Sequence, residues 1–175
     1  NPQASIKMRI HRLKEGFDLE KNYTATESLE YDKQELAEVV FSANDIQNQN
    51  LRIDLSDLGE KFYNDRELEF FNDPIDFIEY FKGLALITES SEGSVVGFEV
   101  DPASSTTNTQ TSGLFLYYRT SADSTADTTF YKFPISVNYQ RFNQIIHDRP
   151  QVLSDLKENN QTISSDLTRD EVFLL

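Results

Sequence analysis

Apolar and polar residues alternate with a period of two near the start of the chain. From Ser5 to Leu13, Ile6, Met8 and Ile10 are set against Lys7, Arg9 and His11. This pattern predicts a strand with one apolar and one cationic face. Residues 14–35 are polar and predict irregular structure with scattered anchors, which are Phe17, Leu19, Tyr23 and Tyr31. Residues 39–41 and 51–55 predict two further short strands, because apolar residues recur there.

The pattern then changes to one typical of helices. Asp57 and Glu60 have capping-box spacing and predict a short helix over residues 57–64. A second helix is predicted over residues 74–82, where Asp73 can cap the first turn and Pro74 suits its first position. Gly83 then supplies a left-handed stop.

After Gly83 the period returns to two, over residues 84–88, 95–100, 114–120 and 130–137. Short connections, including a Glu92-Gly93 turn, predict an antiparallel meander of these four strands. Residues 101–113 contain mostly Ser, Thr, Asn and Gln, so we expect a flexible polar loop that is too polar to bury and that tolerates shortening. Residues 149–158 predict a short helix, and residues 171–175 predict an apolar strand.

These elements predict a mainly β protein, an antiparallel β-sandwich of jelly-roll or Greek-key type with two short helical insertions. We expect residues 1–175 to form a single domain, part of a longer protein. Both terminal strands carry apolar side chains and lack a neighbouring hairpin partner, so we expect them to pair with strands distant in sequence.

The composition of the chain limits the classes of partner that it can bind. The chain has 175 residues and a formal net charge of −14, with 16 Lys plus Arg against 30 Asp plus Glu. This excess of negative charge argues against nucleic acid and against anionic membrane surfaces as binding partners. The chain has no cysteine, so disulfides, thiol nucleophiles and cysteine–zinc sites are excluded.

Five segments carry a family resemblance. They are Met8-Arg-Ile-His-Arg-Leu13, Leu51-Arg-Ile-Asp-Leu55 with Leu58-Gly59, Tyr80-Phe-Lys-Gly-Leu84, Leu114-Phe-Leu-Tyr-Tyr118, and Arg141-Phe-Asn143 with His147-Asp148-Arg149. The series resembles an uncharacterised family of Bacteroidetes cell-envelope lipoproteins, a domain of unknown function. The resemblance implies an extracytoplasmic, outer membrane-associated location, in the periplasm or at the cell surface. It also implies a lipid anchor in the full-length protein, and it supplies no catalytic residues.

Candidate catalytic groups are few. The only histidines are His11 and His147, and His147-Asp148 has the residue types of a base with an orienting carboxylate. The alternative is a His-Asp-Arg turn, which we favour because no nucleophile motif accompanies it.

Residues 54–81 carry nine acidic and two basic residues. A glycosidase uses two facing carboxylates, but acids at helix starts and on exposed helix faces explain these positions without a site.

Two pairs of acids are candidate calcium ligands: Asp123 with Asp127, and Asp73 with Asp76. Neither pair has EF-hand spacing, and we expect no cofactor beyond a possible structural Ca²⁺.

A set of aromatic residues could form a sugar-stacking platform, but we expect it to be core with Ile75 and Ile78 beside it. The set is Phe70, Phe71, Phe77, Tyr80 and Phe81. Asn22-Tyr23-Thr24 and Asn160-Gln161-Thr162 match the N-glycosylation pattern, and we expect both to be unused.

Three functions follow, in this order. The first is a non-enzymatic cell-envelope lipoprotein domain that scaffolds or binds a protein or glycan partner at the outer membrane. The second is a carbohydrate-binding module, by analogy with other sandwiches. The third is a hydrolase that uses His147 and the acidic cluster.

Overall fold

The computed structural model describes residues 3–18, 20–46, 50–90, 97–107, 109–119, 128–136 and 139–145. The chain divides into two compact units, Asn1–Asn22 with Ser28–Arg141, and Tyr23–Glu27 with Phe142–Leu175. In the second unit, residues 23–27 and 142–145 are described. There the rings of Tyr23 and Phe142 stack with centroids 5.0 Å apart, and the Ile145 amide donates to the Ala25 carbonyl over 2.9 Å.

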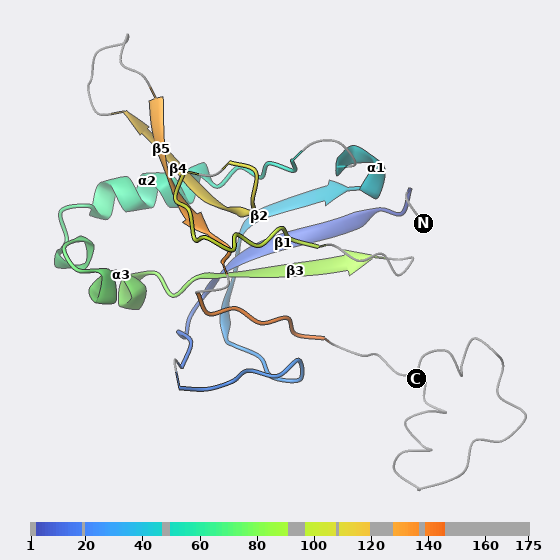
Figure 1. Cartoon of the computed structure of the whole chain (residues 1–175), viewed down its shortest axis with the longest axis horizontal. Coiled ribbons are helices and arrows are strands. Elements are labelled where there is room, and N and C mark those ends of the chain that lie inside the picture. The colour runs from blue at the N-terminus through green and yellow to red at the C-terminus, as the bar shows by residue number, and fades with distance from the viewer. Residues whose placement is uncertain are drawn as a thin grey trace, which may run out of the picture. The chain divides into compact units, whose positions relative to one another are not determined.

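The assigned helices and strands lie in the first unit (Figure 1). In chain order they are β1 (Ile6–Leu13), β2 (Tyr31–Phe41), α1 (Ala43–Ile46), α2 (Ser56–Asp65), the 3₁₀ helix η1 (Glu69–Phe71), α3 (Pro74–Tyr80), β3 (Leu84–Ser90), β4 (Gly113–Arg119) and β5 (Thr128–Pro134). Among the described residues the chain is therefore mainly β, with two antiparallel sheets and short helices. No described helix has the length and apolar character needed to cross a bilayer.

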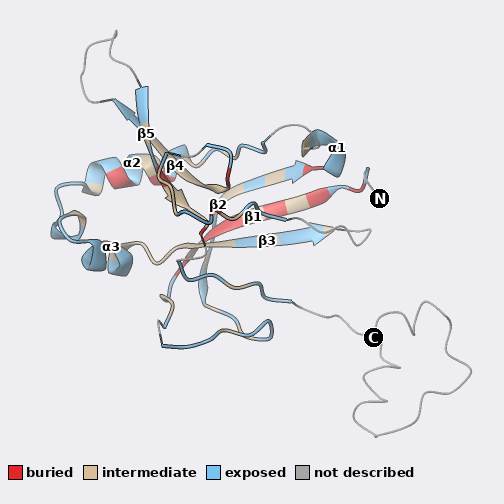
Figure 2. Ribbon diagram, in the orientation of Figure 1, coloured by how far each residue is buried: buried red, intermediate tan, exposed pale blue. Residues whose placement is uncertain are grey.

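The larger sheet has the strand order β2-β1-β3, with β1 antiparallel to both neighbours. The apolar face of β1 is buried, since Ile6, Met8 and Ile10 are each at most 4% exposed (Figure 2). Met8 lies opposite Val39 on one side and Thr88 on the other. The predicted first strand is confirmed, and so is its pairing with segments distant in sequence.

The cationic face of β1 is matched by acids on both neighbouring strands. Lys7 donates to Glu38 of β2 over 3.2 Å. Arg9 pairs with Glu89 of β3 and lies 3.9 Å from Glu35 of β2. Opposite charges on adjacent strands stabilise a register, so these pairs reinforce the alignment that the buried face sets.

The smaller sheet is the hairpin of β4 and β5, which places Leu116 opposite Tyr131. Two helices cover part of it. A Cβ at Gly59 of α2 would lie 3.8 Å from Leu116 Cδ1, and the Phe77 ring of α3 stacks on Phe133 of β5 at 5.8 Å. Both helical insertions therefore pack against this sheet.

Several strand predictions were wrong. Strand β2 begins at Tyr31 and not at residue 39, so part of the span predicted as irregular is sheet. Residues 51–55 form no strand; Ile53 packs instead against the buried cluster of Ile6, Met8 and Phe41. The alternation there reflects one-sided burial without a strand partner.

The predicted four-strand meander was also wrong. Strand β3 pairs with β1, while β4 and β5 pair only with each other among the described residues. Residues 97–100 form no strand. The Glu92-Gly93 turn, residues 95–96, the helix predicted at 149–158 and the strand at 171–175 lie outside the described residues.

Helix starts and stops test the capping predictions. Both predicted helices exist as α2 and α3, but α2 has Leu55 at its N-cap without a side-chain cap, so the capping box was wrong. Helix α3 starts as predicted: the Asp73 carboxylate accepts the Ile75 amide over 2.7 Å, and Pro74 follows. It ends at Tyr80, and Gly83 follows with φ +118°, a conformation that side chains rarely adopt.

Candidate functional site

Helices α2 and α3 and the 3₁₀ helix η1 form one helical layer, whose inner side is an aromatic cluster around Phe62. The Phe62 side chain is 4% exposed. Its ring meets those of Phe71, Phe77 and Phe81 edge-on, at centroid separations of 6.3, 5.8 and 5.1 Å. Edge-to-face contacts of this kind add to the stabilisation from burial. The cluster therefore fixes α2, η1 and α3 as a single layer.

The outer side of α3 is apolar and exposed. Ile75 is 73% exposed and Ile78 is 57% exposed. The two residues are three apart and so share one helix face, while Phe77 lies on the face that contacts Phe62. The prediction that Ile75 and Ile78 lie in the core was therefore wrong.

The predicted aromatic set divides in the same way. Phe71, Phe77, Tyr80 and Phe81 contact Phe62 and are half-buried, so their assignment to the core holds in part. Phe70 is 44% exposed, and its ring stacks on Tyr80 at 5.9 Å. The exposed apolar residues of this layer are Tyr63, Leu68, Phe70, Ile75 and Ile78.

Tyr80 connects the helical layer to the larger sheet. Arg12 of β1 donates to the Tyr80 carbonyl, and its guanidinium lies 5.2 Å from the centre of the Tyr80 ring. The Tyr80 hydroxyl donates to the Asp65 carboxylate over 2.6 Å. Burial and this bond raise the pKa of Tyr80 to about 12, because both disfavour the phenolate. Hydrogen bonds from Lys61 and Tyr80 hold the pKa of Asp65 below its usual value.

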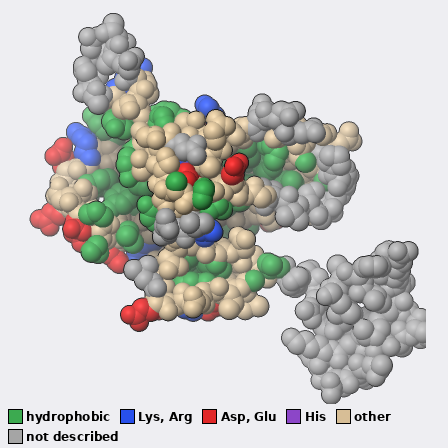
Figure 3. Space-filling model, viewed as in Figure 1, with side chains coloured by type: hydrophobic (Ala, Val, Ile, Leu, Met, Phe, Trp, Pro, Cys, Tyr) green, Lys and Arg blue, Asp and Glu red, His purple; other side chains and the backbone are tan. Residues whose placement is uncertain are grey.

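Acidic side chains surround the apolar face. Figure 3 shows green apolar side chains over α3 and the segments next to it, with red acidic side chains around them. The two bases of residues 54–81 are already engaged, Lys61 with Asp65 at 2.8 Å and Arg66 with Glu67 at 3.4 Å. Six of the nine acids form no ion pair among the described residues: Asp54 and Asp73, which accept hydrogen bonds from Ser56 and Ile75, and Asp57, Glu60, Glu69 and Asp76. This surface therefore carries a strong negative field.

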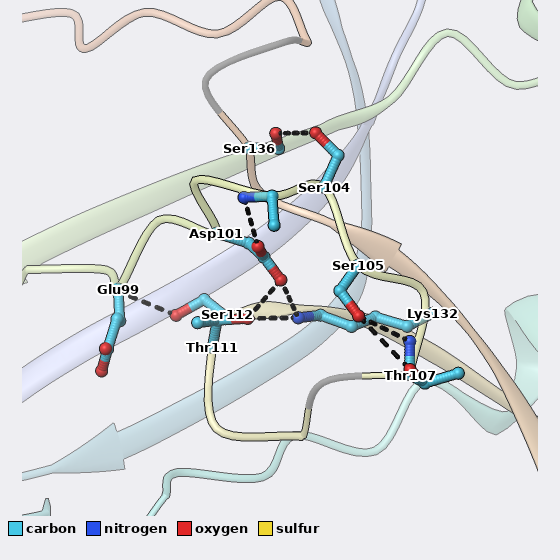
Figure 4. Close-up of polar contacts among 10 residues, drawn as sticks. Glu99, Asp101, Ser104, Ser105, Thr107, Thr111, Ser112, Lys132 and Ser136 are labelled. Atoms are coloured by element: carbon cyan, nitrogen blue, oxygen red, sulfur yellow. Dashed lines mark hydrogen bonds and ion pairs between the residues drawn. The ribbon is translucent and has the colours of Figure 1, made fainter.

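A second polar feature lies beneath the loop that precedes β4 (Figure 4). Lys132 and Asp101 are fully buried, with Nζ 3.5 Å from the carboxylate. The Thr111 hydroxyl donates to Asp101 over 3.0 Å and accepts from Lys132. The expectation that residues 101–113 are too polar to bury was wrong at Asp101 and Thr111. The mobility of this loop stays a prediction.

The ionisation of Asp101 follows from its partners. Burial alone would raise the pKa of Asp101. The amides of Ala103 and Ser105, the Thr111 hydroxyl and the Lys132 ammonium outweigh burial, so the net shift of the Asp101 pKa is downward. The pair is thus a carboxylate and an ammonium whose hydrogen-bonding groups are satisfied, which is the arrangement of a structural ion pair.

The candidate catalytic histidines are not brought together as a described site. His11 is buried in β1, with Nδ1 2.9 Å from the Asp32 carbonyl and its ring 5.0 Å from that of Tyr31. This environment is that of a core histidine. His147 and Asp148 lie outside the described residues, so their proposed role stays a prediction.

The metal candidates give no described site either. The Asp73 carboxylate is used as the N-cap of α3, and Asp76 is exposed in the first turn. In the described parts of the chain, no group of three or more His, Cys, Asp or Glu side chains is placed to hold a metal ion. Asp123 and Asp127 lie outside those parts.

A cavity of about 580 Å³ lies beside the end of β2. It is lined by Val39, Val40, Phe41, Asp45, Asn50, Leu51 and Arg52. The Asp45 carboxylate accepts from the Ser42 amide and hydroxyl, over 2.6 and 2.8 Å. Asp45 is thus a local turn cap, and we assign no ligand to this cavity.

Comparison with known proteins found no matching family model, no matching curated protein and no matching solved structure. The described residues define a β-rich protein of two antiparallel sheets with a helical layer that exposes apolar side chains. The exposed face of α3 and the buried pair Asp101–Lys132 were both missed from the sequence. The one signal for the pair is a lysine within the otherwise apolar and aromatic run from Phe130 to Pro134.

Proposed function

We propose that this chain is a non-enzymatic domain of a cell-envelope protein that binds a protein partner on the outer face of α3. The observation that carries the proposal is the exposure of Ile75 (73%) and Ile78 (57%) on a helix whose opposite face is anchored to Phe62. Contiguous apolar side chains exposed on a rigid element mark interaction sites. Scattered single residues would not carry this argument.

The location and the finer fold belong to the same proposal. The resemblance of segments such as Tyr80-Phe-Lys-Gly-Leu84 to envelope lipoproteins supports a scaffolding or binding role at the outer membrane. Two antiparallel sheets, with β1 paired to strands distant in sequence, support a sandwich of jelly-roll or Greek-key type.

The test compares binding by the wild-type chain and by an Ile75→Ser/Ile78→Ser variant. Each immobilised protein is exposed to solubilised Bacteroidetes envelope proteins, and retained proteins are identified by mass spectrometry. Val40→Ser is the matched control, because Val40 is 56% exposed on β2, outside the helical layer. The proposal predicts a protein retained by wild type and control and lost from the double variant. Identical retained sets for all three would refute it.

A carbohydrate-binding module is the second candidate. One observation favours it: Tyr117, Tyr118 and Tyr131 of the β4–β5 hairpin are 55%, 44% and 47% exposed. Tyrosine rings on a sheet can stack against sugars, and Tyr117 is already aligned with Phe115 at 6.4 Å and 20°. Glycan-array binding that is lost in Tyr117→Ala would favour this function over protein binding.

The hydrolase alternative rests on His147 and the acidic cluster. A panel of esterase, glycosidase and peptidase substrates tests it, with His147→Ala as the matched variant. Turnover by wild type that disappears in the variant would replace the binding proposal with an enzymatic one.

A further inference from the structure

We propose that the outer face of α3 selects a protein segment that is both apolar and cationic, with Lys or Arg residues flanking aliphatic ones. The inference rests on the proposed function, since it specifies the partner of the same surface. Glu79 is four residues after Ile75 and so lies on the same face of α3, while Asp76, which follows Ile75 directly, is an exposed neighbour at the edge of that face. A segment that covers the two isoleucines must therefore approach these carboxylates.

Among the described residues, the negative charge around the face is not fully neutralised. Nine acids face two bases between residues 54 and 81, and both bases are paired with acids of the same segment. Glu79 has a neighbouring base in Lys82 at 3.2 Å, but the Glu79 side chain remains 69% exposed. Asp76 forms no ion pair among the described residues. Covering Asp76 with a neutral or acidic segment would remove water without supplying a counter-charge.

Other classes of partner fit less well. Insertion of the isoleucines into an anionic membrane would bring Asp76 and Glu79 close to its negative surface, which repels them. Nucleic acid is repelled for the same reason. A sugar would stack on aromatic rings, whereas the exposed large apolar side chains of α3 are the aliphatic Ile75 and Ile78. A cationic, amphipathic protein segment satisfies both the apolar and the acidic side chains.

The probes are three synthetic peptides of equal length. One is an amphipathic helix of Leu and Lys, one is the same helix with Glu in place of Lys, and one has Ser in place of Leu. Binding of each fluorescently labelled peptide to the chain is measured by anisotropy across a range of salt concentrations. The inference predicts that only the Leu/Lys peptide binds and that its affinity falls as salt rises.

Two variants assign the binding to this face. Ile75→Ser/Ile78→Ser should weaken the Leu/Lys peptide about tenfold or more. Asp76→Asn/Glu79→Gln should weaken it several-fold and flatten the salt dependence, because two of the charges that attract it are gone. Val40→Ser and Glu99→Gln are the matched controls, since both residues are exposed away from the helical layer. Controls that weaken binding as much as the variants would overturn the inference.

The outcomes also separate this inference from the proposed function. If the Leu/Glu peptide binds as tightly as the Leu/Lys peptide and the isoleucine variant abolishes both, the docking face stands and the cationic selectivity is refuted. If wild type binds anionic phosphatidylserine vesicles and the isoleucine variant does not, the partner is a membrane and the inference fails. If the isoleucine variant changes neither peptide binding nor the retained envelope proteins, both proposals fail.

Discussion

The buried pair of Asp101 and Lys132 predicts a strongly destabilising substitution. Lys132→Met keeps most of the side-chain volume but removes the ammonium, so Asp101 and the acceptor side of Thr111 lose their buried cation. Breaking a buried ion pair by removing one partner costs about 3–5 kcal/mol. In a protein of this size about 1 kcal/mol corresponds to 2–4 °C, so the melting temperature should fall by about 6–20 °C.

Urea unfolding followed by circular dichroism measures the change, and Lys7→Met is the matched control. Lys7 also pairs with an acid, but both side chains are about 40% exposed, 43% for Lys7 and 40% for Glu38. An exposed pair contributes about 0–1 kcal/mol. Adding Asp101→Asn to Lys132→Met removes the uncompensated charge and keeps an acceptor for the Ala103 amide, so part of the stability should return. If Lys132→Met and Lys7→Met unfold at the same urea concentration, the reasoning is wrong.

Four further predictions concern single elements. Gly113→Ala should cost about 1–3 kcal/mol in urea unfolding, because the new Cβ would lie 2.7 Å from the Phe133 carbonyl and from Lys132 Cε. Asp73→Ala should cost about 1 kcal/mol by the same measurement through loss of the α3 cap, and Asp73→Asn should restore most of it. Because the folded-state pKa of Tyr80 is raised from 10.0 to about 12, its contribution to stability is complete below pH 10 and is lost as pH rises toward 12; ultraviolet titration should show a late-ionising tyrosine that Tyr80→Phe lacks. Deleting residues 1–13 removes the central strand, and a protein that still melted within a degree of the parent would contradict its central place.

The sequence predicted a strand where one face is apolar and buried. It did not predict which strands pair with each other. Strand β1 was predicted because its apolar face is the core, and Ile6, Met8 and Ile10 recur at every second position. Most of β2 was missed because residues 31–38 are largely polar: this strand lies at the sheet edge, and its Glu35 and Glu38 face the bases of β1. Hydrophobic periodicity does not reveal a strand that is held in the sheet by charge pairs with its neighbour.

The candidate site shows a related ambiguity. Helix α3 has two apolar faces, one with Phe77 and Tyr80 and one with Ile75 and Ile78. Helical spacing alone cannot say which of them is buried, because both satisfy the same period. The aromatic face is the buried one because Phe62, which lies on a different helix, packs against Phe77 and Tyr80. The buried Lys132 was missed because its partner Asp101 lies in a loop whose composition predicts exposure.

The way α3 is held explains how its outer face can be reserved for a partner. A helix of seven residues is not stable alone, so its order comes from tertiary contacts. Those contacts use the Asp73 cap on the Ile75 amide, the rings around Phe62 and the Arg12 guanidinium against Tyr80, and none of them uses the side chain of Ile75 or Ile78. Substituting serine for the two exposed isoleucines should therefore leave the free energy of unfolding within about 0.5 kcal/mol of the parent. The fold does not need these side chains, which is why changes in binding caused by their substitution can be read as recognition rather than as unfolding.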